Sequence, residues 1–208
     1  MARTVGRLDC GSSGLAALAG AAISMGLIQL LAEPLDQVST VDVQELAVQT
    51  TMLAAPLLIS LLLLLRDGPR MVRQGARLAH RQSRWRRQLW LEHAWPVSLN
   101  MVALVPYVLA AALLAAMATR PELDSISDLS LLLGSLNPRM LAVSVLKTAV
   151  FALVTLWIAL LQGAHAERRG LPSTAALSRA ISTTLAVVLA LDVIWALTVD
   201  SIISNVRI

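Results

Sequence analysis

Two ionisable residues stand inside long apolar stretches of this sequence. Lys147, the only lysine of the chain, interrupts the run VSVLKTAVFALV, and Asp192 interrupts the run TLAVVLALDVIWALTV. Burying a single charge in apolar surroundings is costly, so buried charges are usually paired. We therefore expect the Lys147 ammonium to face the Asp192 carboxylate. Such a pair could serve only to fix the register of two helices, or it could be a polar feature of a substrate path.

A stripe of arginines is the second charged feature. The gaps between its members are three or four residues, so they share one face of a helix. Unpaired like charges on one face repel each other and need anions from elsewhere. Anionic lipid headgroups or acidic residues of a cytoplasmic partner could supply them, and a solvated helix extension that only sets topology is the alternative. The candidate contact residues are Arg70, Arg73, Arg77, Arg81 and Arg84.

No motif for catalysis, nucleotide binding or metal binding is found in the sequence. The phosphate-loop pattern GxxxxGK[ST] and the patterns HExxH and GxSxG are all absent. The three histidines, His80, His93 and His165, lack the clustering that zinc requires. We therefore expect no catalytic residue, no metal site and no cofactor in this chain, so any ATP would be bound by a partner subunit. Nucleic acid is not expected as a ligand, since no fold that binds it is recognisable.

The composition indicates the elements that must position these residues. Of the 208 residues, 57% are hydrophobic and only 14% are charged, whereas a soluble domain carries roughly 25% charged residues. Such a chain cannot cover itself with a polar surface, so we expect one integral membrane domain over residues 1–208. Cys10 is the only cysteine, which excludes an intrachain disulfide.

Five apolar stretches are long enough to be membrane-spanning helices, which need about 20 mostly apolar residues. The sequence therefore predicts an all-α membrane bundle with five transmembrane helices. Proline is tolerated inside such helices, so kinks without breaks are expected at Pro56 and Pro106. The expected spans are 14–32, 49–65, 97–118, 140–163 and 181–203.

The two buried charges are expected at similar depths. Lys147 lies seven residues into its span, roughly 10 Å from the outer face at the rise of an α-helix. Asp192 lies eleven residues beyond Ile181, which leaves roughly 13–14 Å to the same face of a 30 Å core. The two spans are consecutive and antiparallel, so the depths support the pairing.

The distribution of arginines predicts the orientation. Thirteen of the sixteen arginines lie at the N-terminus or in the connections 66–96 and 164–180. Because cytoplasmic segments carry an excess of positive charge, we expect the N-terminus in the cytoplasm, the C-terminus outside, and a basic cytoplasmic helix over 66–96. Within the first span, Ala16, Gly20 and Ser24 form a small-residue stripe that allows helices to approach closely. It is expected to pack inside the chain, with a subunit contact as the alternative.

The second half of the chain, about 97–203, resembles the MlaE/YrbE family of permeases. Lys147 stands where the family has the lysine of "IKSxxF", and Gly163 matches the glycine that closes the same helix. Arg179, between Ser178 and Ala180 and shortly before a Ser-Thr-Thr run, resembles the family's "GRATT". Asp192 and Pro106 also match family positions. The chain departs from the family in its short N-terminal region and in carrying arginines where the family has an acidic stretch that docks on the ATPase.

The resemblance implies a function and a set of partners. Members of the family are permease subunits of ABC transporters that move phospholipids across the bacterial inner membrane together with MCE-domain proteins. This chain would then be a multi-pass, non-enzymatic subunit that forms a homodimer and works with an ATPase and an MCE-domain protein. The alternative is a non-transporting membrane scaffold whose arginine-rich helix recruits a partner or anionic lipid.

Overall fold

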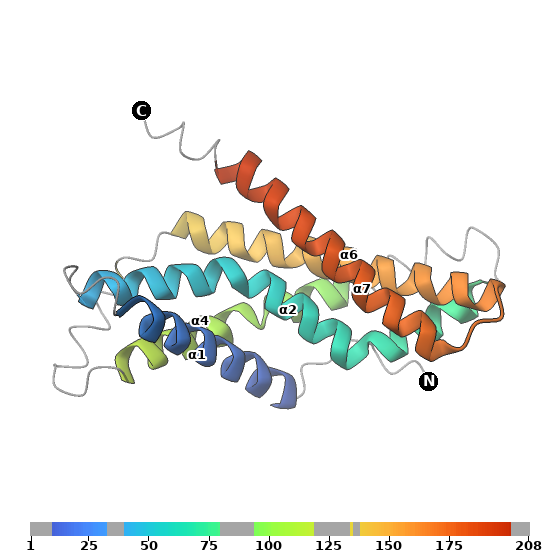
Figure 1. Cartoon of the computed structure of the whole chain (residues 1–208), viewed down its shortest axis with the longest axis horizontal. Helices are drawn as coiled ribbons and strands as arrows, with labels where there is room; N and C mark the ends of the chain where they lie inside the picture. The colour runs from blue at the N-terminus through green and yellow to red at the C-terminus, as the bar shows by residue number, and fades with distance from the viewer. Residues whose placement is uncertain (1–9, 33–39, 80–93, 119–133, 135–137, 201–208) are drawn as a thin grey trace. The chain divides into compact units, whose positions relative to one another are not determined.

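The computed structural model describes residues 10–32, 40–79, 94–118, 134 and 138–200 (Figure 1). Throughout these residues the regular structure is helical, which confirms the all-α prediction. The labelled helices and one π-helical turn are α1 (Cys10–Ala32), α2 (Thr40–Leu78), α4 (Val105–Ala118), α6 (Pro138–Arg168), α7 (Ser173–Trp195) and η1 (Ala196–Asp200). Residues 94–102 form a further helical segment just before α4.

Within the described residues, four helical segments are long and apolar enough to cross a membrane. They are Leu46–Leu78, Ala94–Ala118, Pro138–Arg168 and Ser173–Thr198. α1 contributes a shorter apolar segment, Gly14–Leu30. The apolar helices thus correspond one to one with the five stretches expected from the sequence, and they identify a multi-pass membrane protein.

The helices extend beyond the expected spans at several ends. α2 runs without interruption from Thr40 to Leu78, so the span expected over 49–65 and the first half of the basic segment form one helix. Gly68 and Pro69, which often mark a turn, lie within this helix and do not end it. Residues 80–93 fall outside the described part, and Arg81 and Arg84 with them.

The two span prolines behave differently. Pro56 lies within the continuous helix α2. At Pro106 the helix is distorted more than the expected kink, because a turn at residues 103–104 interrupts the helix just before α4. Proline has no amide hydrogen to donate to a preceding carbonyl. The chain instead makes the short-range bonds from Leu104 N to Met101 O (3.0 Å) and from Tyr107 N to Leu104 O (3.1 Å).

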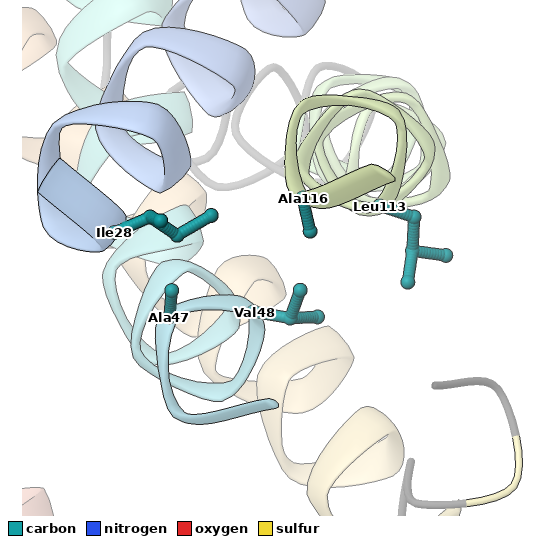
Figure 2. Close-up of a cluster of buried hydrophobic side chains, with 5 residues drawn as sticks. All are labelled: Ile28, Ala47, Val48, Leu113 and Ala116. Carbon is teal, nitrogen blue, oxygen red and sulfur yellow. The ribbon is translucent and has the colours of Figure 1, made fainter. Parts of the chain in front are cut away.

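The chain divides into two compact units, which we describe separately. Unit 2 comprises Gly6–Leu62 and Ser98–Val150. In this unit α1 packs along α4, and the N-terminal part of α2 joins them. Figure 2 shows the cluster of buried side chains that closes this packing, with contributions from all three helices. The cluster consists of Ile28, Ala47, Val48, Leu113 and Ala116.

Unit 1 comprises Met1–Val5, Leu63–Val97 and Phe151–Ile208. It contains the C-terminal halves of α2 and α6 and all of α7. Its core cluster is made of small side chains, with Leu171 and Leu177 packed against it. The cluster consists of Val72, Ala166, Ala176 and Ala180. Both α2 and α6 run through the boundary between the units, and a single domain over 1–208 stays a prediction.

A tight turn joins α6 to α7. Gly170 adopts a left-handed conformation with a φ of 62°, which a residue without a side chain adopts at little cost. The Leu171 amide donates to the Ala166 carbonyl (2.9 Å), and the Gly170 amide donates to the Glu167 carbonyl (3.2 Å). These two bonds form a Schellman motif that ends α6. Pro172 then occupies the N-cap position of α7, where its carbonyl accepts from the Ala175 and Ala176 amides.

Candidate functional site

The expected buried lysine lies in a polar segment of α6. Lys147 is only 5% exposed, and Ser144 and Thr148, which share its face of the helix, are buried as well. The Ser144 hydroxyl donates to the Met52 carbonyl of α2 (3.1 Å), and the Thr148 hydroxyl donates to the Ser144 carbonyl (2.7 Å). The lysine therefore belongs to a buried polar stretch within an otherwise apolar helix.

Asp192 continues a line of buried residues on α7. Ala176, Ala180, Thr184 and Val188 are buried at intervals of four residues, and Asp192 is the next position in this series. Its side chain is half-buried, and the Oδ1 atom of its carboxylate is inaccessible to solvent. Lys147 belongs to unit 2 and Asp192 to unit 1, so the pairing of these two residues stays a prediction.

The arginine stripe forms one face of the C-terminal part of α2. We call Arg66, Arg70, Arg73 and Arg77 the arginine face. Arg66 is half-buried, whereas the other three are exposed. The opposite side of the same helical segment is buried at Met71, Val72 and Gly75. Arg81 and Arg84 lie outside the described residues.

A buried acid supports the arginine face, and the sequence reasoning missed it. Asp67 is only 1% exposed. The Nη1 atom of Arg70 lies 3.4 Å from its Oδ1 atom, while 69% of the Arg70 side chain remains exposed. Among the described residues, the Oδ2 atom of Asp67 is buried without a hydrogen-bond partner. The signal was the spacing of three residues between the two side chains, which places them together on a helix.

Glycines allow α2 and α6 to touch through their backbones. A Cβ atom at Gly163 would overlap the carbonyl oxygen of Val72, and a Cβ atom at Gly75 would overlap the carbonyl oxygen of Leu160. We call this reciprocal arrangement the α2–α6 contact. It explains why position 163 requires a glycine, whereas the sequence reasoning did not single out Gly75.

The other residues matched to the family lie at exposed positions. Pro106 is exposed at the second position of α4, and Arg179 is exposed on α7 beside the buried Ala180. Arg179 therefore does not contribute to the packing of unit 1 and remains accessible for a partner or a ligand.

The small-residue stripe of α1 faces α4. Ala16, Gly20 and Ser24 are all buried. A Cβ atom at Gly20 would lie 2.8 Å from the Val108 carbonyl oxygen, and the Ser24 hydroxyl donates to the Ala112 carbonyl (3.2 Å). We call this arrangement the α1–α4 contact. It places the stripe inside the chain, against another helix of the same unit.

Among the described residues, no three histidine, cysteine or acidic side chains lie close enough together to hold a metal ion. Buried polar residues such as Ser144, Lys147 and Thr148 instead lie within apolar helices, as they do in integral membrane proteins. Comparison with known families identifies the class of membrane protein. The family model described as Permease MlaE matches residues 94–198, half of the chain, and the chain belongs to this family.

The family match confirms the resemblance read from the second half of the sequence. It begins at Ala94, the first residue of the helical segment before α4, and extends to Thr198 in the middle of η1. Lys147, Gly163 and Asp192 all fall inside the matched region. No curated protein and no solved structure matched the chain.

Proposed function

We propose that the chain is the membrane-embedded permease subunit of an ABC-type transporter that moves phospholipids. The observation that carries this proposal is the match to the MlaE permease family over residues 94–198. Membership in this family favours a transport role over a catalytic one. In this role the chain supplies the path through the membrane and leaves ATP hydrolysis to a separate subunit.

The buried polar stretch of α6 supports a path for a polar headgroup. A headgroup that crosses an apolar layer needs polar groups along its way, and ionisable residues within a membrane commonly mark such pathways. Ser144, Lys147 and Thr148 are buried on one face of α6. We assign Lys147 to the edge of the lipid path, with Asp192 as its counter-charge.

The α2–α6 contact supports a route for coupling. Gly75 lies in the part of α2 that carries the arginine face, and Gly163 lies on the helix that carries Lys147. Because the two backbones touch, a force on the C-terminal end of α2 would act directly on α6. A cytoplasmic ATPase that binds this end could thereby move the helix that lines the lipid path.

The proposed assembly contains several proteins. Two copies of the chain would frame the lipid cavity, an ATPase would bind ATP and act on the cytoplasmic side, and an MCE-domain protein would exchange lipid outside. The membrane would be the inner membrane of a bacterium. Orientation follows from the arginine distribution, with the N-terminus in the cytoplasm.

Purification tests the proposed assembly. The tagged full chain, extracted from its native membrane in mild detergent, should bring with it an ABC ATPase and an MCE-domain protein. ATP should then drive transfer of a fluorescent phospholipid when the complex is reconstituted into liposomes, and it should not do so with a hydrolysis-deficient ATPase. Recovery of the chain with neither partner would count heavily against the proposal.

The alternative function is a membrane scaffold, and the exposure of Arg73 and Arg77 supports it because exposed arginines can bind a partner. Charge reversal on the arginine face separates this alternative from the permease. Arg73→Glu, Arg77→Glu and Arg81→Glu are combined in one variant. A permease that couples through α2 should lose ATP-driven lipid transfer in this variant. A scaffold should lose its partner while lipid transfer by any linked transporter continues.

A further inference from the structure

The arginine face begins where the apolar part of α2 ends. Residues 46–65 contain no charged side chain. Twenty helical residues span about 30 Å, which matches the thickness of the hydrocarbon core of a bilayer. Arg66 therefore stands at the edge of that core, and α2 continues without interruption to Leu78.

The helical rise places the remaining arginines at different heights. Arg70, Arg73 and Arg77 stand about 6, 10 and 16 Å beyond Arg66 along the helix axis. The headgroup layer on each side of the core is about 5–8 Å thick. Arg70 is thus level with the headgroups, and the long side chain of Arg73 can reach back to them. Arg77 stands too far from the layer to do so.

The surroundings leave these arginines available to an external anion. Arg70, Arg73 and Arg77 are exposed, and Arg73 and Arg77 make no ion pair or hydrogen bond with any described residue. Asp67 is the only acidic residue between positions 46 and 91. It is buried and engages one side of the Arg70 guanidinium at 3.4 Å. Since a guanidinium has five N–H donors, Arg70 keeps several for a second anion.

We propose that Arg70 and Arg73 bind the phosphate groups of anionic lipids in the leaflet next to the C-terminal half of α2. The planar guanidinium fork suits bidentate hydrogen bonds to phosphate oxygens. Asp67 acts as a positioning residue that fixes the Arg70 guanidinium at headgroup height. This lipid is bound on the outside of the helix, so the site is separate from the path of the transported lipid and does not depend on the proposed transport.

Lipid binding to the purified full chain tests the proposal. The chain in dodecyl maltoside is titrated with phosphatidylglycerol or with phosphatidylcholine of the same acyl chains, and native mass spectrometry measures the bound fraction. The chain should prefer phosphatidylglycerol. Arg70→Gln and Arg73→Gln should each weaken phosphatidylglycerol binding about fivefold, the effect expected for one arginine near an anionic surface. Arg77→Gln, on the same face, is the matched control and should change binding by less than about twofold.

Three results would overturn the proposal. The first is equal binding of the two lipids by the unaltered chain. The second is a loss in Arg77→Gln as large as that in Arg73→Gln, which would point to an acidic protein surface along the whole arginine face. The third is displacement of phosphatidylglycerol by an equal concentration of glycerol 1-phosphate, which would identify a site for free phosphate.

Further variants guard against a folding defect. Thermal unfolding in dodecyl maltoside should be the same for Arg73→Gln, Arg77→Gln and the unaltered chain, because these two side chains are exposed. Arg70→Gln also removes the cation beside the buried Asp67 carboxylate, so it should unfold somewhat earlier. If a glutamine variant unfolds early, Arg70→Lys and Arg73→Lys replace it. Each retains the charge but loses the bidentate fork, so each should bind phosphatidylglycerol less tightly than arginine and more tightly than glutamine. Lysine variants that bind phosphatidylglycerol no more tightly than phosphatidylcholine would also contradict the proposal.

Discussion

The two compact units bring helices together with small residues in different ways. In the α1–α4 contact, one glycine admits the opposite backbone and the neighbouring Ser24 adds a hydrogen bond to the Ala112 carbonyl. In the α2–α6 contact, Gly75 and Gly163 each face a carbonyl of the opposite helix, and neither position has room for a side chain. In the first contact, a single substitution can remove the hydrogen bond. The second contact requires that both Gly75 and Gly163 lack a side chain.

The difference indicates where the molecule tolerates change. A serine hydroxyl contributes a modest and replaceable interaction between membrane helices. In a reciprocal glycine contact, backbone meets backbone. A carbonyl oxygen cannot rotate away from an added methyl group as the end of a side chain can, so the contact cannot adjust to a substitution. We therefore expect the α2–α6 contact to be the more rigid of the two. This rigidity suits a connection that must carry force.

The largest effect is expected on α6, which runs through both units. If Lys147 and Asp192 form a pair, Lys147→Met leaves a buried carboxylate without its counter-charge and should destabilise the protein by about 3–5 kcal/mol. Adding Asp192→Leu should restore part of the loss. Thermal unfolding in detergent measures both changes, with Lys147→Arg as a charge-preserving control. A double variant no more stable than the weaker single variant would exclude the pairing.

The next largest effect tests the rigidity of the α2–α6 contact. Gly75→Ala and Gly163→Ala each place a methyl group against a backbone carbonyl, so each should destabilise the fold by about 1–3 kcal/mol. Gly26→Ala on α1 is the matched control, since nothing lies within 4 Å of a Cβ atom there. Unfolding midpoints in the same detergent provide the comparison. Variants as stable as Gly26→Ala would show that the two helices are farther apart than described.

A smaller steric effect is expected in the α1–α4 contact. A methyl group at position 20 would lie 2.8 Å from the Val108 carbonyl oxygen and 3.0 Å from its Cγ1 atom. Because this approach to a carbonyl oxygen is less close than those at Gly75 and Gly163, a smaller backbone shift relieves it, and Gly20→Ala should cost about 1 kcal/mol, the low end for overpacking. A loss equal to that of Gly75→Ala would remove the contrast between the two contacts.

The smallest effect concerns the polar link. Ser24→Ala removes the hydrogen bond to the Ala112 carbonyl and should cost about 0.6 kcal/mol, the average found for such bonds between membrane helices. Equilibrium unfolding with increasing sodium dodecyl sulfate resolves a change of this size. Ser182→Ala is the control, since the Ser182 hydroxyl is exposed and bonds only within its own helix, to the Ser178 carbonyl. A loss above that of Gly20→Ala would make the hydroxyl the main determinant of this contact.

The helices could be predicted from the sequence because apolar runs of this length have few other uses. The four-residue spacing of Ala16, Gly20 and Ser24 likewise gave a packing face. The spacing did not name α4 as the neighbour, since a stripe identifies one surface of a contact and not the other. The turn before Pro106 was underestimated for a related reason, because a proline fixes a missing donor but not how the chain compensates.

The residues that the sequence did not reveal depend on tertiary context. Asp67 stands beside Arg66 in a run of arginines, where an acid is ordinarily solvated, yet in the folded chain it is only 1% exposed. Gly75 lies among polar residues, and its contact with α6 is visible only in the folded chain. The family match covers half of the chain and begins after both positions, so it could not have drawn attention to them.

The short turn between α6 and α7 has a consequence for biosynthesis. The turn closes on Gly170 with two backbone hydrogen bonds, and Arg168 and Arg169 lie immediately before it. With the tip in the cytoplasm, as the arginine distribution predicts, we expect two apolar helices joined so tightly to enter the bilayer as one hairpin whose tip is not translocated. The insertion machinery would then settle the topology of both helices in a single event, and α7 would need no start signal of its own.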